Sequence, residues 1–386
     1  MPVRNRFAEL HDEITGWRRD FHAHPELQFE VHRTAARVAD LLRDFGCDEV
    51  VEGVGKTGVV GIIKGQAEGA RCVGLRADMD ALPIEEATGL DYASTVPGTM
   101  HACGHDGHTA MLLGAAKYLA ETRNFAGSVA VIFQPAEEGG GGGREMVNDG
   151  MLDRFGIDEV YGLHNIPGRT LGEFAIRPGN FYAATGVFEI EMHGRGGHAA
   201  YPHEAVDPIL ASSQTVLALQ SIVSRSIDPM HSVVVSVTSL ESITTTHNVI
   251  PDNVLLKGTT RTMNATSADI TEERFRQIVE ATAKAHGCRA VIRYDRNYPG
   301  VVNSEAETDY AASAAAAVSG DCAEAEPTMW GEDFAFFLQE RPGAYIHLGI
   351  GDASGLHTPE YNFNDDAIPF GCSWFVELAE SRLAAV

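Results

Sequence analysis

The hydrophobic pattern of residues 5–180 switches repeatedly between helical and extended segments. Residues 5–46 carry apolar positions at helical spacing in two blocks, and the second block ends at Gly46, a residue type common after helix C-termini. Short apolar runs of β type then alternate with further helical segments. We expect strands at 57–65, 70–80, 127–134, 159–165 and 172–179, and helices at 111–120 and 143–152. Such an order is typical of an α/β sheet covered by helices.

The pattern changes near Phe181. Strand-like alternation is found at 186–194, 231–243, 254–263 and 289–300. Two amphipathic helices are expected between these strands, at 205–225 and at 271–287. The second helix is predicted to start at Thr271, a capping residue type, and to end at Gly287. The resulting order, β-α-β-β-α-β, is that of the ferredoxin-like split unit.

Length and pattern together favour two domains. The 386 residues exceed the usual size of a single hydrophobic core. After residue 297, two helices, a strand at 344–351 and a last helix at 367–384 resemble the first part of the chain again. We therefore expect an α/β domain made of residues 1–183 and 297–386, with a small α+β domain of residues 184–296 inserted into it.

Charge and cysteine usage exclude several classes of partner and compartment. The chain has 54 acidic and 29 basic residues, a formal net charge of -25, and no run of Lys or Arg, so nucleic-acid binding is not expected. The apolar runs are too short to cross a bilayer, and the N-terminal segment lacks the apolar stretch of a signal peptide. The 6 cysteines lack paired spacing, which favours reduced thiols. We therefore expect a cytoplasmic protein.

The segment MHACGHDGHTA at 100–110 gathers imidazole, thiol and carboxylate groups in a loop that opens a helix. Cys103 and His105 are two positions apart, which in extended backbone puts both on one side. Thiolate and imidazole are good ligands for zinc and neighbouring transition metals. A buried thiol beside a helix-capping histidine explains this pair better when the pair is taken alone.

Further ligand-type residues follow other strands of the same expected sheet. Glu137 and Glu138 follow the strand at 127–134 and precede five glycines, whereas His164 ends one strand and His357 follows another. Each of these, taken alone, is explained by an acidic turn or a structural histidine. Ligands collect at the carboxyl ends of strands in such sheets, so we expect the set to converge. The expected ligands, Cys103, His105, Glu138, His164 and His357, suit two metal ions that share a bridging ligand and a water.

At these residues the chain resembles a known family. The motifs RADMDALPI, MHACGHDGHTAMLLGAA, FQPAEEGGGG, GRGGHAAYPH, HNVIPD and LHTPEYNFND are similar to those of the di-metal amidohydrolases that include aminoacylases and carboxypeptidases. More narrowly they resemble the hippurate hydrolase and indoleacetyl-amino-acid hydrolase branch. The resemblance covers nearly the whole chain. It implies a mixed-sheet catalytic α/β domain with two metal ions and an inserted ferredoxin-like lid and dimerisation domain.

The resemblance also implies roles for the ligand-type residues. Cys103 is expected to bridge the two metal ions, where the peptidase branch uses an aspartate. The remaining ligands are expected to be His105, Glu138, His164 and His357. Asp78 stands where the peptidase branch has a histidine ligand, and Asp80 is expected to support the site without binding metal. Glu137 corresponds to the general base that deprotonates the metal-bound water and then protonates the leaving amine.

For the inserted domain, the resemblance implies contacts to the substrate. His198 corresponds to a histidine that stabilises the developing oxyanion, usually from the partner subunit. Asn248 and Arg261 correspond to residues that hold the free α-carboxylate of the substrate, a group that the planar guanidinium fork of arginine fits well. The resemblance also implies a homodimer or a higher homo-oligomer formed through this domain.

The activity implied by the resemblance is metal-dependent hydrolysis of N-acyl-L-amino acids of the N-acetyl, N-benzoyl or indoleacetyl type. A dipeptidase or an N-acetyl-diamino-acid deacetylase is the alternative within the family, and a non-catalytic metal-binding homologue is the alternative outside the enzymes. The mixed donor set suits manganese or zinc, and also accepts cobalt or nickel. The expected partner is a small molecule, with neither nucleic acid nor membrane.

Overall fold

The computed structural model describes residues 5–242, 244 and 246–384, and contacts divide the chain into two compact units. The first unit extends to Gly179 and also contains Val302–Glu326 and the chain from Asp333 onward. The second unit consists of Asn180–Val301 and Pro327–Glu332. None of the described helices is both long enough and apolar enough to cross a membrane. The division into a catalytic and a lid domain stays a prediction.

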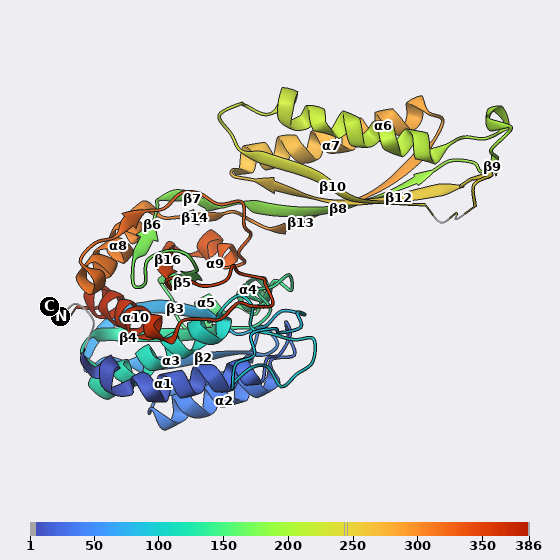
Figure 1. Ribbon diagram of the computed structural model, residues 1–386. Coiled ribbons are helices and arrows are strands. Elements are labelled where there is room, and N and C mark those ends of the chain that lie inside the picture. Colours follow the sequence, from blue (N-terminus) through green and yellow to red (C-terminus); the bar gives the residue numbers. More distant parts are fainter. Residues whose placement is uncertain (1–4, 243, 245, 385–386) are drawn as a thin grey trace. The chain divides into compact units, whose positions relative to one another are not determined.

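An eight-stranded mixed sheet forms the centre of the first unit (Figure 1). Its strands, in spatial order, are β1 (Glu49–Val54), β2 (Gly58–Lys64), β4 (Ala126–Gln134), β3 (Ala67–Asp78), β5 (Glu159–Ile166), β16 (Gly343–Gly349), β6 (Phe174–Ile176) and β15 (Ala323–Glu324). The four central strands β4, β3, β5 and β16 are parallel, and antiparallel strands flank them. The predicted mixed α/β class is confirmed.

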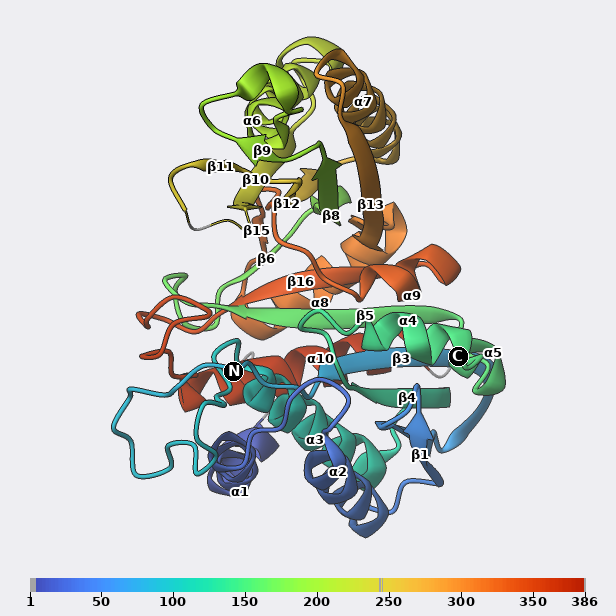
Figure 2. The same cartoon turned by 90° about the vertical axis from the view of Figure 1, so that its right-hand side faces the viewer.

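Eight helices of the described chain accompany this sheet. They are α1 (Asn5–Ala23), α2 (His32–Asp44), α3 (His105–Thr122), α4 (Gly142–Asn148), α5 (Met151–Arg154), α8 (Glu305–Ser319), α9 (Ala335–Glu340) and α10 (Ile368–Arg382). Helix α3 is buried on nearly all sides because it packs against α1, α2 and α10, as Figure 2 shows. Its apolar sequence thus reflects a central position, which fixes the loop that precedes it.

A buried polar network joins α1 to the first turn of α3. His22 places Nδ1 2.8 Å from Asp106 Oδ2 and Nε2 3.3 Å from Glu86 Oε1. Arg18, fully buried, donates to Asp106 Oδ2 at 3.3 Å and to Asp365 Oδ1 at 2.8 Å. Burial opposes the charged form of His22, but the hydrogen bonds to Asp106 and Glu86 outweigh it and raise its pKa to about 9. His22 is therefore one of the buried residues that hold the first turn of α3 in place.

The second unit contains a four-stranded antiparallel sheet covered by two helices that lie side by side (Figure 1). The sheet order is β10 (Val233–Ser242), β12 (Asn253–Thr262), β8 (Ala184–His193) and β13 (Arg289–Tyr298), and the helices are α6 (Pro208–Ser221) and α7 (Ala265–Ala285). The chain order β8-α6-β10-β12-α7-β13 is the predicted ferredoxin-like split unit. Two short ribbons complete the strands: β9 (Gly197–His198) with β11 (Val249–Ile250), and β7 (Gly179–Tyr182) with β14 (Val301–Asn303).

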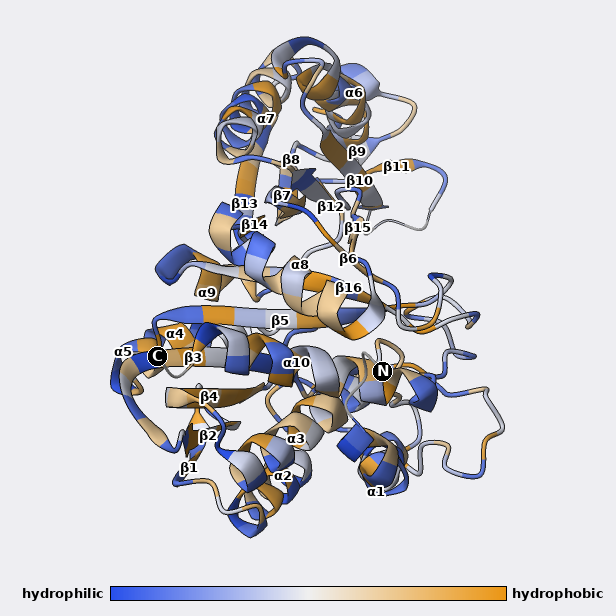
Figure 3. Ribbon diagram, turned by 90° about the vertical axis from the view of Figure 1, so that its left-hand side faces the viewer, coloured by the Kyte–Doolittle hydropathy of each residue, from blue (hydrophilic) through white to orange (hydrophobic). Residues whose placement is uncertain are grey.

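The predicted start of one helix is wrong. Helix α7 begins at Ala265, and its N-cap is Asn264, whose side chain accepts a hydrogen bond from Ser267 N at 2.8 Å. Thr271, the expected cap, is a buried residue inside the helix. Figure 3 shows hydrophilic and hydrophobic residues mixed along α7, as the amphipathic pattern indicated. Ile243, the last residue of the strand expected at 231–243, lies outside the described residues.

The raised pKa of His22 predicts a pH-dependent contribution to stability. The contribution is complete below the free-histidine pKa of 6.5 and is lost as the pH rises through about 9, because the folded protein then gives up the extra proton. We expect His22→Gln to lower the free energy of unfolding of the metal-free protein by about 3 kcal/mol at pH 6 and by much less at pH 10. Denaturant titrations at several pH values measure this difference. A deficit that stays constant with pH, or one equalled by the exposed control His32→Gln, would contradict it.

Candidate metal centre

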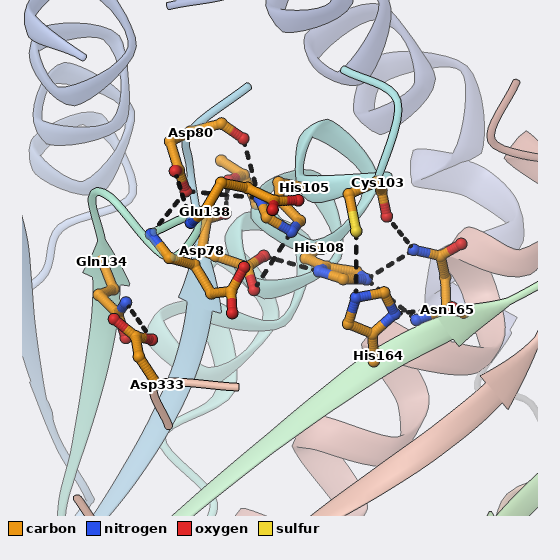
Figure 4. Close-up of polar contacts among 12 residues, drawn as sticks. Asp78, Asp80, Cys103, His105, His108, Gln134, Glu138, His164, Asn165 and Asp333 are labelled. Atoms are coloured by element: carbon orange, nitrogen blue, oxygen red, sulfur yellow. Dashed lines mark hydrogen bonds and ion pairs between the residues drawn. The ribbon is translucent and has the colours of Figure 1, made fainter. Parts of the chain in front are cut away.

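Three neighbouring strands of the first unit end at the same edge of the sheet and bring together residues from distant parts of the sequence. Strand β3 ends at Asp78, and β4 ends at Gln134, just before Glu137 and Glu138. Strand β5 contributes His164 near its own end. Because these strands are parallel neighbours, their carboxyl ends meet. The loop that contains Cys103 lies at this edge (Figure 4).

The predicted ligand atoms form overlapping clusters. Three sets of ligand atoms each lie within 4.8 Å of one another: Cys103, His105 and His164; Cys103, Glu138 and His357; and His105, Glu137 and Glu138. The Cys103 Sγ lies 3.4 Å from His164 Nε2, and His357 Nε2 lies 3.1 Å from Glu138 Oε1. Cys103 therefore belongs to two different clusters, as a bridging ligand requires.

Backbone carbonyls orient two of the histidines. His105 donates from Nδ1 to Asp80 O at 2.8 Å, and His164 donates from Nδ1 to Asn165 O at 2.7 Å. In both rings Nε2 is then directed away from this carbonyl, and His105 Nε2 is buried without a hydrogen-bond partner. Metal-binding histidines commonly show this arrangement, with the second nitrogen bound to a carbonyl. A buried nitrogen placed in this way is suited to bind a cation.

The loop around Cys103 has its shape because residue 104 is a glycine. Gly104 has φ +87, a conformation that disfavours side chains, and it serves as the N-cap of α3. A Cβ atom there would lie 2.4 Å from both Asn165 Nδ2 and Tyr361 OH. The same neighbours hold the loop, since Asn165 Nδ2 donates to Cys103 O at 2.6 Å and Tyr361 OH donates to Asn165 Oδ1 at 2.7 Å.

Asp80 supports the glutamate pair without lying among the clustered ligands. Its carboxylate accepts hydrogen bonds from Glu137 N and Glu138 N, each at 3.0 Å, so both backbone positions after β4 are fixed. Asp80 Oδ1 also lies 3.4 Å from His105 Nδ1. One buried carboxylate therefore links the glutamate turn to the first residue of α3.

Asp78 is held by a second buried network. Arg76, fully buried, donates to Asp78 Oδ2 at 2.7 Å and to Asp333 Oδ1 at 3.0 Å. The other Asp78 oxygen accepts from His108 Nδ1 at 2.7 Å, and His108 Nε2 accepts from Asn165 N at 3.0 Å. Asp78, His105 and His108 also form a compact group. Because both nitrogens of His108 already have partners, this ring orients the site and is not a free ligand.

The electrostatics of the clusters favour a bound cation. Burial, reinforced by the carboxylates of Glu138 and Glu137, raises the pKa of the Cys103 thiol well above its usual value. Burial opposes the charged form of His105, yet Asp78 and Asp80 raise its pKa to about 10. Both groups therefore hold protons that a metal ion would displace.

The pKa values of His164 and Glu138 are lowered, in contrast to those of Cys103 and His105. Burial, followed by the charge of His108, lowers the pKa of His164 well below its usual value. For Glu138, burial favours the neutral acid, but the hydrogen bond with His357 and the charge of His105 lower its pKa. A neutral imidazole and an ionised carboxylate are the forms that ligate metals. His357 itself is half exposed and has φ +61, so the loop after β16 holds it in an uncommon backbone conformation.

The remaining predicted residues lie in the second unit. His198 pairs with Val249 in the β9–β11 ribbon, and Ala199 N donates to Asn248 O at 3.0 Å, so His198 and Asn248 are neighbours. The Nδ1 of His198 accepts a hydrogen bond from Ala200 N at 3.1 Å, which leaves the proton of the neutral ring on Nε2. Arg261 lies in β12 and donates to Thr260 O at 2.9 Å. Among the described residues, no carboxylate forms an ion pair with it.

Sequence reasoning did not single out Arg76, Asn165 or Tyr361. Arg76 and Tyr361 lie inside the motifs RADMDALPI and LHTPEYNFND, and Asn165 directly follows the ligand-type residue His164. Their roles depend on contacts between distant segments, which the linear sequence does not display.

Comparison with known proteins identifies the family. The model of peptidase family M20/M25/M40 matches residues 74–381, so the chain belongs to this family. The hippurate hydrolase of Campylobacter jejuni is 40% identical over 374 residues, covering 96% of this chain and 97% of the relative. An N-acetyl-L-cysteine deacetylase of Bacillus subtilis is 39% identical over 377 residues, covering 97% and 89%. The family and branch that the motifs resemble are confirmed.

A solved structure agrees with these relatives. The crystal structure of a dinuclear metal binding peptidase of the M20 family from Bacillus subtilis matches with a TM-score of 0.86 and 34% identity, covering 98% of this chain and 100% of the other. The whole fold, including both compact units, is therefore shared with a protein of this family.

The crowding around Gly104 predicts a specific sensitivity to substitution. We expect Gly104→Ala to lower the free energy of unfolding by at least about 2 kcal/mol more than Gly150→Ala. Gly150 is a matched control because it has φ +73 and also precedes a helix, but a Cβ there meets nothing within 4 Å. Denaturant titration of both variants isolates the steric clash from the cost of the backbone conformation. Equal losses in the two variants would show that the Asn165 and Tyr361 contacts do not constrain the loop.

Proposed function

We propose that this protein is a metal-dependent hydrolase that cleaves the amide bond of N-acyl-L-amino acids to a carboxylate and a free amino acid. The membership of Cys103 in two ligand clusters, with Glu137 beside the glutamate ligand of one of them, carries the proposal. The hippurate hydrolase and the N-acetyl-L-cysteine deacetylase among its relatives support the same reaction class.

Two divalent metal ions per subunit would be held by the clustered donors. The site residues fit such ions because they offer a buried thiol, an orphaned imidazole nitrogen and two carboxylates around common points. The proposed ligands are Cys103, which would bridge, together with His105, Glu138, His164 and His357. Manganese or zinc suits this donor set best. A bound cation would lower the pKa of water from about 15.7 toward about 7.

Glu137 would act as the base and then the acid of the reaction. Its backbone is fixed by Asp80, so its buried carboxyl group stays beside His105 and Glu138. We propose that Glu137 accepts a proton from the attacking water and delivers it to the leaving amine nitrogen.

Residues of the second unit would bind the substrate. His198 is suited to donate from Nε2 to the oxyanion, since its Nδ1 already accepts from Ala200 N. Arg261 and Asn248 would hold the α-carboxylate of the substrate. A guanidinium without a carboxylate partner among the described residues supports this role, and it offers a local positive charge in a chain of net charge -25.

The second unit would also be the lid and dimerisation domain. Helix α6 exposes Leu210 and Leu217, which are 51% and 66% accessible. Strand β10 is at the edge of its sheet and exposes Val234 and Leu240. An apolar helix face beside an open strand edge is a typical surface for pairing with a second copy. We further propose that the protein acts in the cytoplasm on small molecules.

The proposed roles of Glu137 and Glu138 predict two distinct losses. We expect Glu137→Gln to lower kcat at least about 100-fold while the protein still binds two metal ions, because the variant keeps every ligand but cannot accept a proton. Glu138→Gln, the matched control at the next position, should lose metal. Amine release from N-benzoyl and N-acetyl amino acids, together with metal analysis after dialysis, measures both effects. Wild-type turnover by Glu137→Gln would rule out the mechanism.

The exposed apolar surface of the second unit predicts the oligomeric state. We expect the wild-type protein to be a dimer at micromolar concentration and the double variant Leu217→Glu/Val234→Lys to be a monomer with unchanged helix content. Val96→Glu serves as the control, because Val96 is an exposed apolar residue of the first unit. Sedimentation or light scattering gives the mass. A wild-type monomer would exclude the dimerisation role.

A further inference from the structure

A pocket of about 350 Å³ lies beside the candidate metal centre, entirely within the first unit. Its lining residues are Leu27, Gln28, Phe29, Glu30, Ala81, Pro83 and Glu138. Glu138 belongs both to the pocket and to two ligand clusters, so the pocket adjoins the candidate metal centre. The volume is within the range of small-molecule sites.

The wall of this pocket is fixed by backbone contacts. Leu27 and Ala81 form a parallel β-bridge, and Ala81 N donates to Glu26 O at 2.8 Å. The Glu26 carboxylate accepts from Thr34 N at 2.8 Å, which ties the segment to the start of α2. Gln28 has φ +46 and donates from Nε2 to Glu138 O at 3.3 Å. The segment 27–30 is thus attached to the same turn that carries Glu138.

The ring of Phe29 is held on two sides. Lys56 Nζ lies 3.8 Å from the ring centroid, a cation–π contact. A Cβ atom on Gly140 would come within 3.2 Å of Phe29 Cε2, so the glycine loop after Glu138 lies close to the ring. Leu27 and Phe29 are only half-buried, although both are apolar. An aromatic ring fixed in this way offers a preorganised apolar contact surface for a ligand.

The charge of the lining distinguishes the two halves of an N-acyl amino acid. The two charged lining residues, Glu30 and Glu138, are both acidic, while Leu27, Phe29, Ala81 and Pro83 are apolar. Glu30, the charged lining residue that is not a proposed metal ligand, would repel the α-carboxylate of the amino-acid half. The acyl half carries no charge and gains from apolar contact.

We propose that this pocket binds the acyl group of the substrate, and that Phe29 selects an aromatic acyl group, of the benzoyl class, over acetyl. The inference rests on the proposed amide hydrolysis and adds the substrate class to it. An acetyl group would leave most of the pocket filled by water, whereas an aryl ring can pack against Phe29 and Leu27. Phe29 is therefore a specificity residue that touches the substrate away from the scissile bond.

The test compares two substrates that differ only in the acyl group. We expect wild-type protein loaded with manganese or zinc to have a higher kcat/KM for N-benzoylglycine than for N-acetylglycine. Phe29→Ala should lower kcat/KM for N-benzoylglycine about 10-fold and change that for N-acetylglycine less than twofold. Leu27→Trp narrows the pocket and should lower the kcat/KM for N-benzoylglycine relative to that for N-acetylglycine. Phe155→Ala is the matched control, since Phe155 is a half-buried ring under a cation but does not line the pocket.

A binding measurement separates this inference from the proposed function. Benzoate, the expected product, should bind the metal-loaded wild-type protein and bind Phe29→Ala at least about 5-fold more weakly, with no such change for acetate. Turnover of both substrates with an unaltered benzoyl to acetyl ratio in Phe29→Ala would overturn the pocket assignment while leaving amide hydrolysis intact. Absence of turnover in the wild-type protein would overturn the hydrolysis, and the benzoate measurement would still decide whether Phe29 forms an aryl site.

Discussion

The carboxyl end of strand β3 is the constraint on which the site depends. Two buried carboxylates, Asp78 and Asp80, lie at this strand end and hold different segments in place. Asp80 fixes the backbone of the glutamate turn and faces His105, whereas Asp78 joins Arg76 to His108. Buried charges of this kind are stable only when every oxygen has partners, so the network requires all of its members at once. The candidate ligands keep their positions because neither carboxylate can move without breaking its hydrogen bonds to the segments that carry them.

Much of the fold follows from local pattern. The alternating strands and helices of the first unit, and the β-α-β-β-α-β order of the second, are encoded by hydrophobic spacing that each segment carries alone. The start of α7 was missed because Asn264 and Thr271 are both capping residue types. Tertiary packing buries Thr271 and leaves Asn264 to cap. Choosing between two such residues needs the environment of each.

The candidate ligands could be named from the sequence because motifs place rare residue types after strands. The residues that hold these ligands in place could not be named from the sequence. Asn165, Tyr361 and Arg76 act through partners far away in the chain, and no local periodicity marks a residue whose role is to hold another. The same holds for Phe29, whose position against Lys56 and Gly140 depends on three separate loops. The pocket that Phe29 lines is thus a property of the folded chain.

The thiol of Cys103, which belongs to two ligand clusters, has a consequence for oxidation of the protein. Sulfur nucleophiles react with oxidants as thiolates, and without a cation the burial and acidic surroundings of Cys103 keep its sulfur protonated. In that protonated form the thiol would react more slowly with peroxide than a thiolate would. With a metal ion bound as proposed, Cys103 would have given up that proton, so its sulfur would be in the reactive ionisation state and would depend on coordination and enclosure for protection. If Cys103 binds metal as proposed, a cysteine at this position would make the oxidative vulnerability of the protein depend on its metal occupancy.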